Sequence, residues 1–85
     1  MTKLARGICY TYMVQCKYGT LYAGWTNDLK KRIIAHNEGR GAKYLRGKGP
    51  ITLVYKKRFK TAKEAQAHER FIKRLKRRKK QELMA

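Results

Sequence analysis

At 85 residues the chain has room for one small domain, because a chain of this length buries only about 60% of its extended surface. A hydrophobic content of 42%, with six Tyr and one Trp, excludes a disordered basic tail. Twenty-three Lys and Arg against five acidic residues give a formal net charge of +18, so nucleic acid is the expected partner. An anionic membrane surface or an acidic protein could use the same charge, which supplies affinity but no chemistry.

The segment 7–16, GICYTYMVQC, is rich in β-branched and aromatic residues and predicts a strand. A short turn at 17–19 and a return strand at 20–25 complete a hairpin. Five residues of the first strand are expected to share one face: Ile8, Tyr10, Tyr12, Val14 and Cys16.

The two cysteines, Cys9 and Cys16, would lie about 23 Å apart in an extended strand. That separation excludes a disulfide between them, and reduced thiols suit a cytoplasmic protein. The sequence shows no signal peptide and no apolar run near the roughly 20 residues of a membrane span, so no membrane association is expected.

The next segment predicts an amphipathic helix, which Thr26 or Asn27 can cap. Asp28 suits the positive end of the helix dipole, and Gly39 is expected to end the helix. Three apolar residues are expected to form its buried stripe: Leu29, Ile33 and Ile34.

Segment 38–50 contains four glycines and one proline between basic residues, which predicts a mobile cationic loop. Residues 51–59 predict a third strand, and Thr61 and Glu64 fit a capping box that begins a second helix. Three residues are expected to face inward from this helix: Ala65, Ile72 and Leu75.

Residues 73–80 carry seven positive charges in eight positions, so the second helix is expected to break near Lys76. The expected element order is therefore β-β-α-β-α, with room for a last short helix. We expect one domain over residues 1–85, with a basic helical tail at 73–85.

The commonest catalytic signatures are missing, because the chain has no Ser, no paired carboxylates and no Cys/His metal cluster. The remaining candidates are Tyr, Arg, His and isolated acids. Phosphodiester cleavage can be built from such groups: one Mg²⁺ on a single carboxylate, an Arg on the phosphate, and a basic group. A Tyr can be that base if neighbouring cations lower its pKa of about 10.

Spacing alone leaves each candidate with a plain structural alternative. Arg32 and His36 are neighbours one helical turn apart, but spacing alone favours a solvated helix edge. Glu69 shares the inward side of the second helix, or else forms an exposed pair with Lys73. The strand tyrosines are also ordinary sheet residues.

Taken together, the segments CYTYMV, LYAGWTNDLKKR and IIAHNEGRGAKY resemble the GIY-YIG nuclease domain. The resemblance covers nearly the whole chain and is greatest to the small standalone bacterial members, the YazA- or YhbQ-like group. It rests on an ordered set of residues: Tyr12, Tyr22, Gly24, Arg32, His36 and Glu69. The first motif departs from the family name, since it reads Tyr10-Thr11-Tyr12.

The resemblance implies an α/β (α+β) fold, a small three-stranded mostly antiparallel sheet flanked by helices. It implies that Tyr12 is the general base or the stabiliser of that base, and that Tyr22 supports the site. Gly24 would let the backbone approach closely, and Arg32 would bind the scissile phosphate. His36 would assist proton transfer or orient Tyr12. Glu69 would bind the divalent metal, Mg²⁺ or Mn²⁺.

Two functions remain open on this basis. The first is a metal-dependent endonuclease that cuts DNA with little sequence preference, on branches, flaps or single strands, in DNA repair or processing. The second is a weakly active or non-catalytic DNA- or RNA-binding accessory protein on the same fold.

The expected partner in both cases is nucleic acid, DNA before RNA, with no small-molecule cofactor. The protein is expected to be a monomer or weak dimer in the bacterial cytoplasm, where association with the nucleoid is compatible with its charge. The predicted nucleic-acid contacts are basic side chains: Lys30, Lys31, Arg40, Lys43, Arg46, Lys48, Lys73, Arg74 and Arg77.

Overall fold

A three-stranded antiparallel sheet forms the centre of the molecule, in a computed structural model that describes residues 8–84. Its strands are β1 (Cys9–Gln15), β2 (Leu21–Thr26) and β3 (Thr52–Phe59), in the order β2-β1-β3. The helices are α1 (Leu29–Asn37), the short 3₁₀ helix η2 (Lys43–Leu45), α2 (Ala62–Arg74) and α3 (Arg77–Leu83). The expected fold and element order, including the last short helix, are confirmed.

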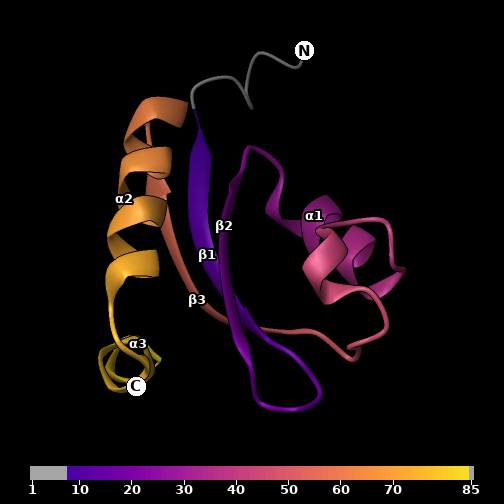
Figure 1. The fold of residues 1–85 in the computed structure, drawn as a ribbon. Helices are drawn as coiled ribbons and strands as arrows, with labels where there is room; N and C mark the ends of the chain where they lie inside the picture. Colours follow the sequence, from indigo (N-terminus) through magenta and orange to yellow (C-terminus); the bar gives the residue numbers. More distant parts are fainter. Residues whose placement is uncertain (1–7, 85) are drawn as a thin grey trace.

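Helices cover both faces of the sheet. Figure 1 shows α2 along one face, and α1 with the segment around η2 on the other. One core cluster gathers Tyr12, Val14 and Leu45 on the α1 side, and a second gathers Met13 and Ile72 on the α2 side. Because β1 is the central strand, its side chains are buried on both faces.

Burial of β1 therefore extends beyond the face that carries Tyr12 and Val14. Thr11 and Met13, on the opposite face, are as fully buried as Tyr12. Thr11 Oγ1 donates a hydrogen bond of 2.6 Å to the Ala65 carbonyl of α2, which satisfies the buried hydroxyl. Ile8, by contrast, lies outside β1 and is exposed.

Helix α1 begins one residue later than the capping candidates suggested. Asp28 is the N-cap, and its Oδ1 accepts the Lys31 N–H at 3.1 Å, while Thr26 Oγ1 accepts the Asp28 N–H. The prediction that Ile34 belongs to the buried stripe of this helix is wrong, because Ile34 is 45% exposed. Positions 29, 33 and 36 share the inward face at helical spacing, so His36 takes the place expected for Ile34.

The segment 38–50 is anchored, although its composition predicts a mobile loop. Leu45 in η2 is only 1% exposed and belongs to the core cluster of the α1 side. Asn37 holds the far end of the segment, since its Oδ1 accepts the Ile51 N–H at 2.7 Å and its Nδ2 donates to the Ile51 carbonyl. Leu45 and the side chain of Asn37 thus hold the two parts of the segment against the rest of the fold.

The second helix follows its local signals closely. Thr61 is the N-cap of α2 and accepts the Glu64 N–H at 3.2 Å. The helix ends at Arg74 and α3 begins at Arg77, which confirms the expected break near Lys76. The basic tail is docked, because Leu83 and Met84 pack against the cluster on the α2 side. Both cysteines are free, as expected.

Between residues 8 and 84, no helix combines the length and the apolar character needed to cross a membrane.

Replacing Leu45 by Ala should lower the free energy of unfolding by about 2–5 kcal/mol, because the change leaves a cavity at the only deep anchor of η2. Urea titration followed by circular dichroism measures this loss. Arg46→Ala, at an exposed neighbouring position, is the matched control and should change stability by less than about 0.5 kcal/mol. Equal stability of the two variants would contradict the anchoring role of Leu45.

Candidate active site

A buried hydrogen bond joins the central strand to α1. Tyr12 on β1 and His36 in the last turn of α1 lie with Oη and Nε2 2.8 Å apart. Tyr12 has no exposed surface and His36 is 2% exposed. The two side chains that the resemblance assigns to proton handling are therefore in direct contact.

The backbone after α1 determines which nitrogen of His36 carries the proton. The Ala42 N–H lies 3.2 Å from Nδ1, and a backbone N–H can only donate. Nδ1 is therefore the acceptor. In the neutral ring Nε2 carries the proton and donates a hydrogen bond to Tyr12 Oη. Burial and the neighbouring Arg32 guanidinium both lower the pKa of His36, which keeps the ring neutral near pH 7.

Two glycines make this contact possible. A Cβ on Gly41 would lie 2.1 Å from His36 Nδ1, and a Cβ on Gly24 would lie 2.6 Å from Tyr12 Oη. Gly24 is paired with Tyr12 across the β1–β2 ladder, so its missing side chain leaves space directly beside the phenol oxygen. At Gly24 the Tyr12 phenol leaves no room for a side chain.

Burial governs the acidity of Tyr12. It raises the pKa of the phenol above its ordinary value, and the Arg32 guanidinium opposes the rise by hydrogen bonding and charge. The charges of Tyr22 and Glu69 raise this pKa further. The condition that neighbouring cations lower the Tyr12 pKa is therefore not met in the free protein, because loss of hydration outweighs the single guanidinium.

Tyr22 on β2 is the partly exposed phenol of the site. Its ring meets that of His36 edge-on, with centroids 5.9 Å apart, and stacks on Tyr44 at 6.0 Å. The other partner of the Tyr44 ring is Lys48, whose Nζ is 3.8 Å from its centroid. The sequence GAKY thus supplies both the Nδ1 contact and an aromatic neighbour of Tyr22.

Arg32 occupies the solvent-facing side of the site. It is exposed, one helical turn before His36, and its charge influences the pKa of both His36 and Tyr12. It helps line a hollow at the start of α1, together with Thr26, Asn27, Asp28, Lys31, Ala35 and Arg40. An exposed guanidinium beside a buried phenol is positioned to accept a phosphate from solvent.

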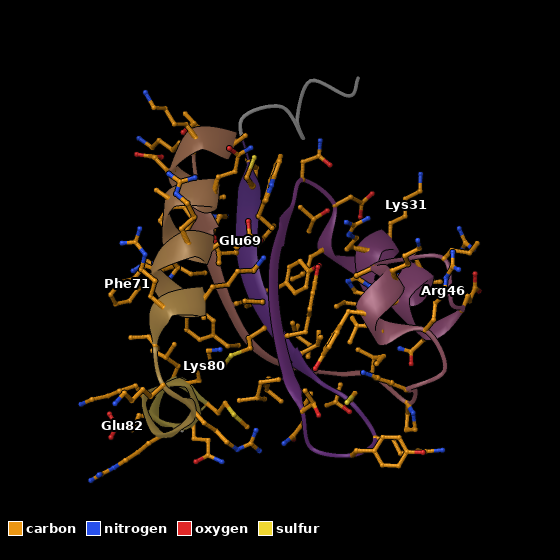
Figure 2. All side chains as sticks on the ribbon, viewed as in Figure 1. Lys31, Arg46, Glu69, Phe71, Lys80 and Glu82 are labelled. Atoms are coloured by element: carbon orange, nitrogen blue, oxygen red, sulfur yellow. The ribbon has the colours of Figure 1, made fainter. Side chains whose placement is uncertain are left out.

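Glu69 approaches the site from α2. Figure 2 places it on the side of this helix that faces the strands, opposite to Phe71. Its Oε2 lies 2.9 Å from Lys73 Nζ, so the pair predicted from spacing is present, but the Glu69 side chain is only 17% exposed against 51% for Lys73. Lys73 Nζ also lies 5.8 Å from the Tyr22 ring centroid.

The structure brings four of the predicted residues close together and places the fifth nearby. Ring contacts join Tyr12, Tyr22 and His36, and Arg32 acts on the first and last of these electrostatically. No hydrogen bond links Glu69 to the other four within the described residues, so it reaches them through its charge and through Lys73.

The donor set at Glu69 suits a hard divalent cation. Residues 8–84 contain no group of three His, Cys, Asp or Glu side chains that could hold a metal between them. Mg²⁺ retains several waters and binds through one or two carboxylates plus substrate phosphates, which matches a single carboxylate beside a phosphate site. The oxygens of Glu69 therefore fit the metal that the resemblance implies.

The predicted nucleic-acid contacts divide into two groups. Four have partners within the protein: Arg40 with Glu38, Lys48 with the Tyr44 ring, Lys73 with Glu69, and Arg77 with the Gly19 carbonyl. The other five are exposed: Lys30, Lys31, Lys43, Arg46 and Arg74. Figure 2 shows Lys31 and Arg46 on the α1 side of the molecule, away from α2.

Three residues of the site were not identified as site residues from the sequence: Gly41, Ala42 and Tyr44. The sequence feature that could have identified them is the repeated glycine in EGRGAKY. Gly39 already provides the left-handed residue after α1, with φ of +79°, so a second glycine two positions later requires another reason. That reason is the His36 ring, which occupies the space of a Cβ at Gly41.

Comparison with known proteins agrees with this arrangement. A family model described as the GIY-YIG catalytic domain matches residues 8–82. The UPF0213 protein CPE1444 of Clostridium perfringens is 53% identical over 76 residues, which cover 89% of this chain and 82% of that protein. The UPF0213 protein YazA of Bacillus subtilis is 44% identical over 72 residues, 85% of this chain and 73% of that one.

Among solved structures, the solution NMR structure of the UPF0213 protein BH0048 from Bacillus halodurans matches with a TM-score of 0.58 and 45% identity. The match covers 89% of this chain and 81% of that one. The chain therefore belongs to the GIY-YIG family, a family of nucleases. Its relatives within that family are small bacterial UPF0213 proteins, which confirms the resemblance drawn from the motifs.

The tautomer of His36 can be observed directly by ¹⁵N NMR of the labelled protein. At neutral pH we expect an unprotonated Nδ1 and a protonated Nε2, because Ala42 donates to Nδ1. Gly41→Ala should weaken this preference, since its Cβ displaces the ring. His68, whose Nε2 is 2.9 Å from Tyr55 Oη, serves as the internal control and should be unchanged. A proton on Nδ1 in the unmodified protein would rule out this arrangement.

Proposed function

We propose that the protein is a metal-dependent endonuclease that hydrolyses phosphodiester bonds of DNA with little sequence preference. The observation that carries the proposal is the buried Tyr12–His36 hydrogen bond, with an exposed Arg32 beside it. A structural Tyr–His pair has no need of a cation at its solvent side. A phosphodiesterase needs one, because the phosphate gains negative charge as the bond breaks.

In this proposal Tyr12 is the general base. The Nε2–H of His36 donates a hydrogen bond to the Tyr12 oxygen before and during the reaction. A neutral His36 that already donates to Tyr12 does not accept the Tyr12 proton. It stabilises the phenolate, as does the charge of Arg32. The raised pKa of Tyr12 in the free protein means that only a small fraction is deprotonated at neutral pH.

Arg32 holds the scissile phosphate through the paired N–H donors of its guanidinium. Tyr22 supports the site from the edge strand, between His36 and the exposed Tyr44. Because Tyr12 has no exposed surface, nucleic-acid binding must open a route from solvent to its oxygen. Glu69 would hold the divalent metal, which when bound neutralises phosphate charge and favours departure of the leaving oxygen.

The substrate class follows from charge. The formal net charge is +18, and exposed cations such as Lys31 and Arg46 lie on the same side of the molecule as α1. Contacts of this kind read phosphates and shape, and carry no base sequence directly. We therefore propose branches, flaps or single strands as substrates, in DNA repair or processing, and a cytoplasmic site of action.

Two observations favour the alternative of a weakly active or non-catalytic accessory protein on the same fold. The phenol of Tyr12 is inaccessible and poorly acidic, and the carboxylate of Glu69 is already paired with Lys73. Both groups would need rearrangement before catalysis. The alternative predicts tight binding of DNA or RNA without cleavage under any metal.

Cleavage of labelled duplex, branched and single-stranded DNA with Mg²⁺, Mn²⁺ or EDTA distinguishes the two functions. We expect metal-dependent cutting that Tyr12→Phe and Glu69→Gln each reduce by at least about a hundredfold. Glu64→Gln removes the same charge from the first turn of α2, where the Glu64 backbone N–H meets the Thr61 cap, and should cut normally. DNA bound tightly but left intact with every metal would support the accessory protein.

The pH dependence tests the role of Tyr12. With saturating DNA, the cleavage rate should rise about tenfold per pH unit through the neutral and mildly alkaline range, because the base form grows as pH approaches a pKa above 10. The residual rate of Tyr12→Phe should lack this slope, whereas that of Tyr22→Phe should keep it. A flat profile for the unmodified protein would exclude Tyr12 as the base.

A further inference from the structure

The ion pair between Lys73 and Glu69 has a consequence for metal binding. The other four acidic residues lie elsewhere: Asp28 caps α1, Glu38 pairs with Arg40, Glu64 is in the first turn of α2, and Glu82 is nearest Lys79. Glu69 is the one acid whose charge influences the pKa of Tyr12. The only carboxylate suited to a metal in the described site is therefore occupied by an ammonium group.

The two side chains of this pair differ in freedom. Glu69 is 17% exposed and lies on the side of α2 facing the strands, so its carboxylate stays close to the site. Lys73 is half exposed, and its four-carbon stem lets the ammonium move while the helix stays fixed by the buried Ile72. A change of partners would therefore move the lysine and leave the glutamate in place.

A divalent cation at Glu69 would compete with Lys73. Two cations on one partly buried carboxylate repel each other strongly, because the repulsion is less screened there than in water. The Lys73 ammonium lies 2.9 Å from Glu69 Oε2, so a metal ion at this carboxylate must displace it. A nucleic-acid phosphate at the site would offer the displaced ammonium a new anionic partner and so favour its departure.

We propose that Lys73 is a resident cation that occupies Glu69 in the free protein and moves to a phosphate oxygen when nucleic acid binds, so that metal and nucleic acid bind cooperatively. The inference rests on the proposed metal role of Glu69. The position of Lys73 near the Tyr22 ring places the ammonium beside the site, within reach of a substrate phosphate. The free protein then binds metal weakly, and the metal site forms fully only with its substrate.

The experiment measures Mn²⁺ binding by electron paramagnetic resonance, without and with a DNA duplex, in a Tyr12→Phe background that prevents cleavage. We expect DNA to tighten Mn²⁺ binding by about tenfold or more. Lys73→Met should bind Mn²⁺ several-fold more tightly than the background protein without DNA, and should gain less from DNA.

Two variants control for charge and folding. Lys63→Met removes one positive charge from the exposed start of the same helix and should behave as the background protein. Lys73→Arg keeps the charge at the same position and should retain weak binding without DNA. Thermal unfolding of each variant confirms that it is folded. If Lys73→Met and Lys63→Met bind Mn²⁺ equally in the absence of DNA, the resident-cation role is overturned.

Two further measurements separate the role of Lys73 from the nuclease function. If Glu69→Gln abolishes Mn²⁺ binding but Lys73→Met leaves it unchanged, Glu69 is the metal ligand and the role of Lys73 is overturned alone. If the expected changes at Lys73 occur while the unmodified protein cuts no DNA with any metal, cooperative binding stands and the nuclease is refuted. Undiminished Mn²⁺ binding by Glu69→Gln would overturn the metal role of Glu69 and, with it, the role of Lys73.

Discussion

The buried hydrogen bond between Tyr12 and His36 is the constraint on which the rest of the site depends. It joins the central strand to α1, and its His36 partner is joined through Nδ1 to the backbone beyond α1. Both atoms are out of contact with water, so each must find its partner within the protein or lose free energy on burial. Gly24 and Gly41 are glycines because the phenol and the imidazole fill the space of their side chains.

The elements with strong local signals could be predicted from the sequence. The Thr61 cap, the glycine after α1 and the charge run that ends α2 act within a few residues of where they occur. The four-residue spacing of Arg32 and His36 likewise predicts that both residues lie on one side of α1. Local rules succeed here because hydrogen bonds and charge repulsion between near neighbours do not depend on the rest of the fold.

What the sequence could not provide depends on contacts between distant segments. Nothing local shows that Leu45 is buried while Ile34 is exposed, because that depends on which side of α1 meets the sheet. The acidity of Tyr12 likewise depends on α1 and the segment around η2, which pack over its face of the sheet and remove its hydration. Composition suggested a phenol surrounded by cations, and the fold leaves it with a single guanidinium and little water.

The stretch from His36 to Ala42 behaves as a spacer of set length. Its first residue is held in α1 and its last must present a backbone N–H to the ring six positions earlier in the chain. One residue added or removed between them would turn a different peptide group toward the imidazole and change which nitrogen is protonated. Surface loops usually tolerate insertions, but here the number of residues is itself part of the chemistry. A designer who wished to graft new binding sequences onto this fold should leave that count alone and work beyond Ala42.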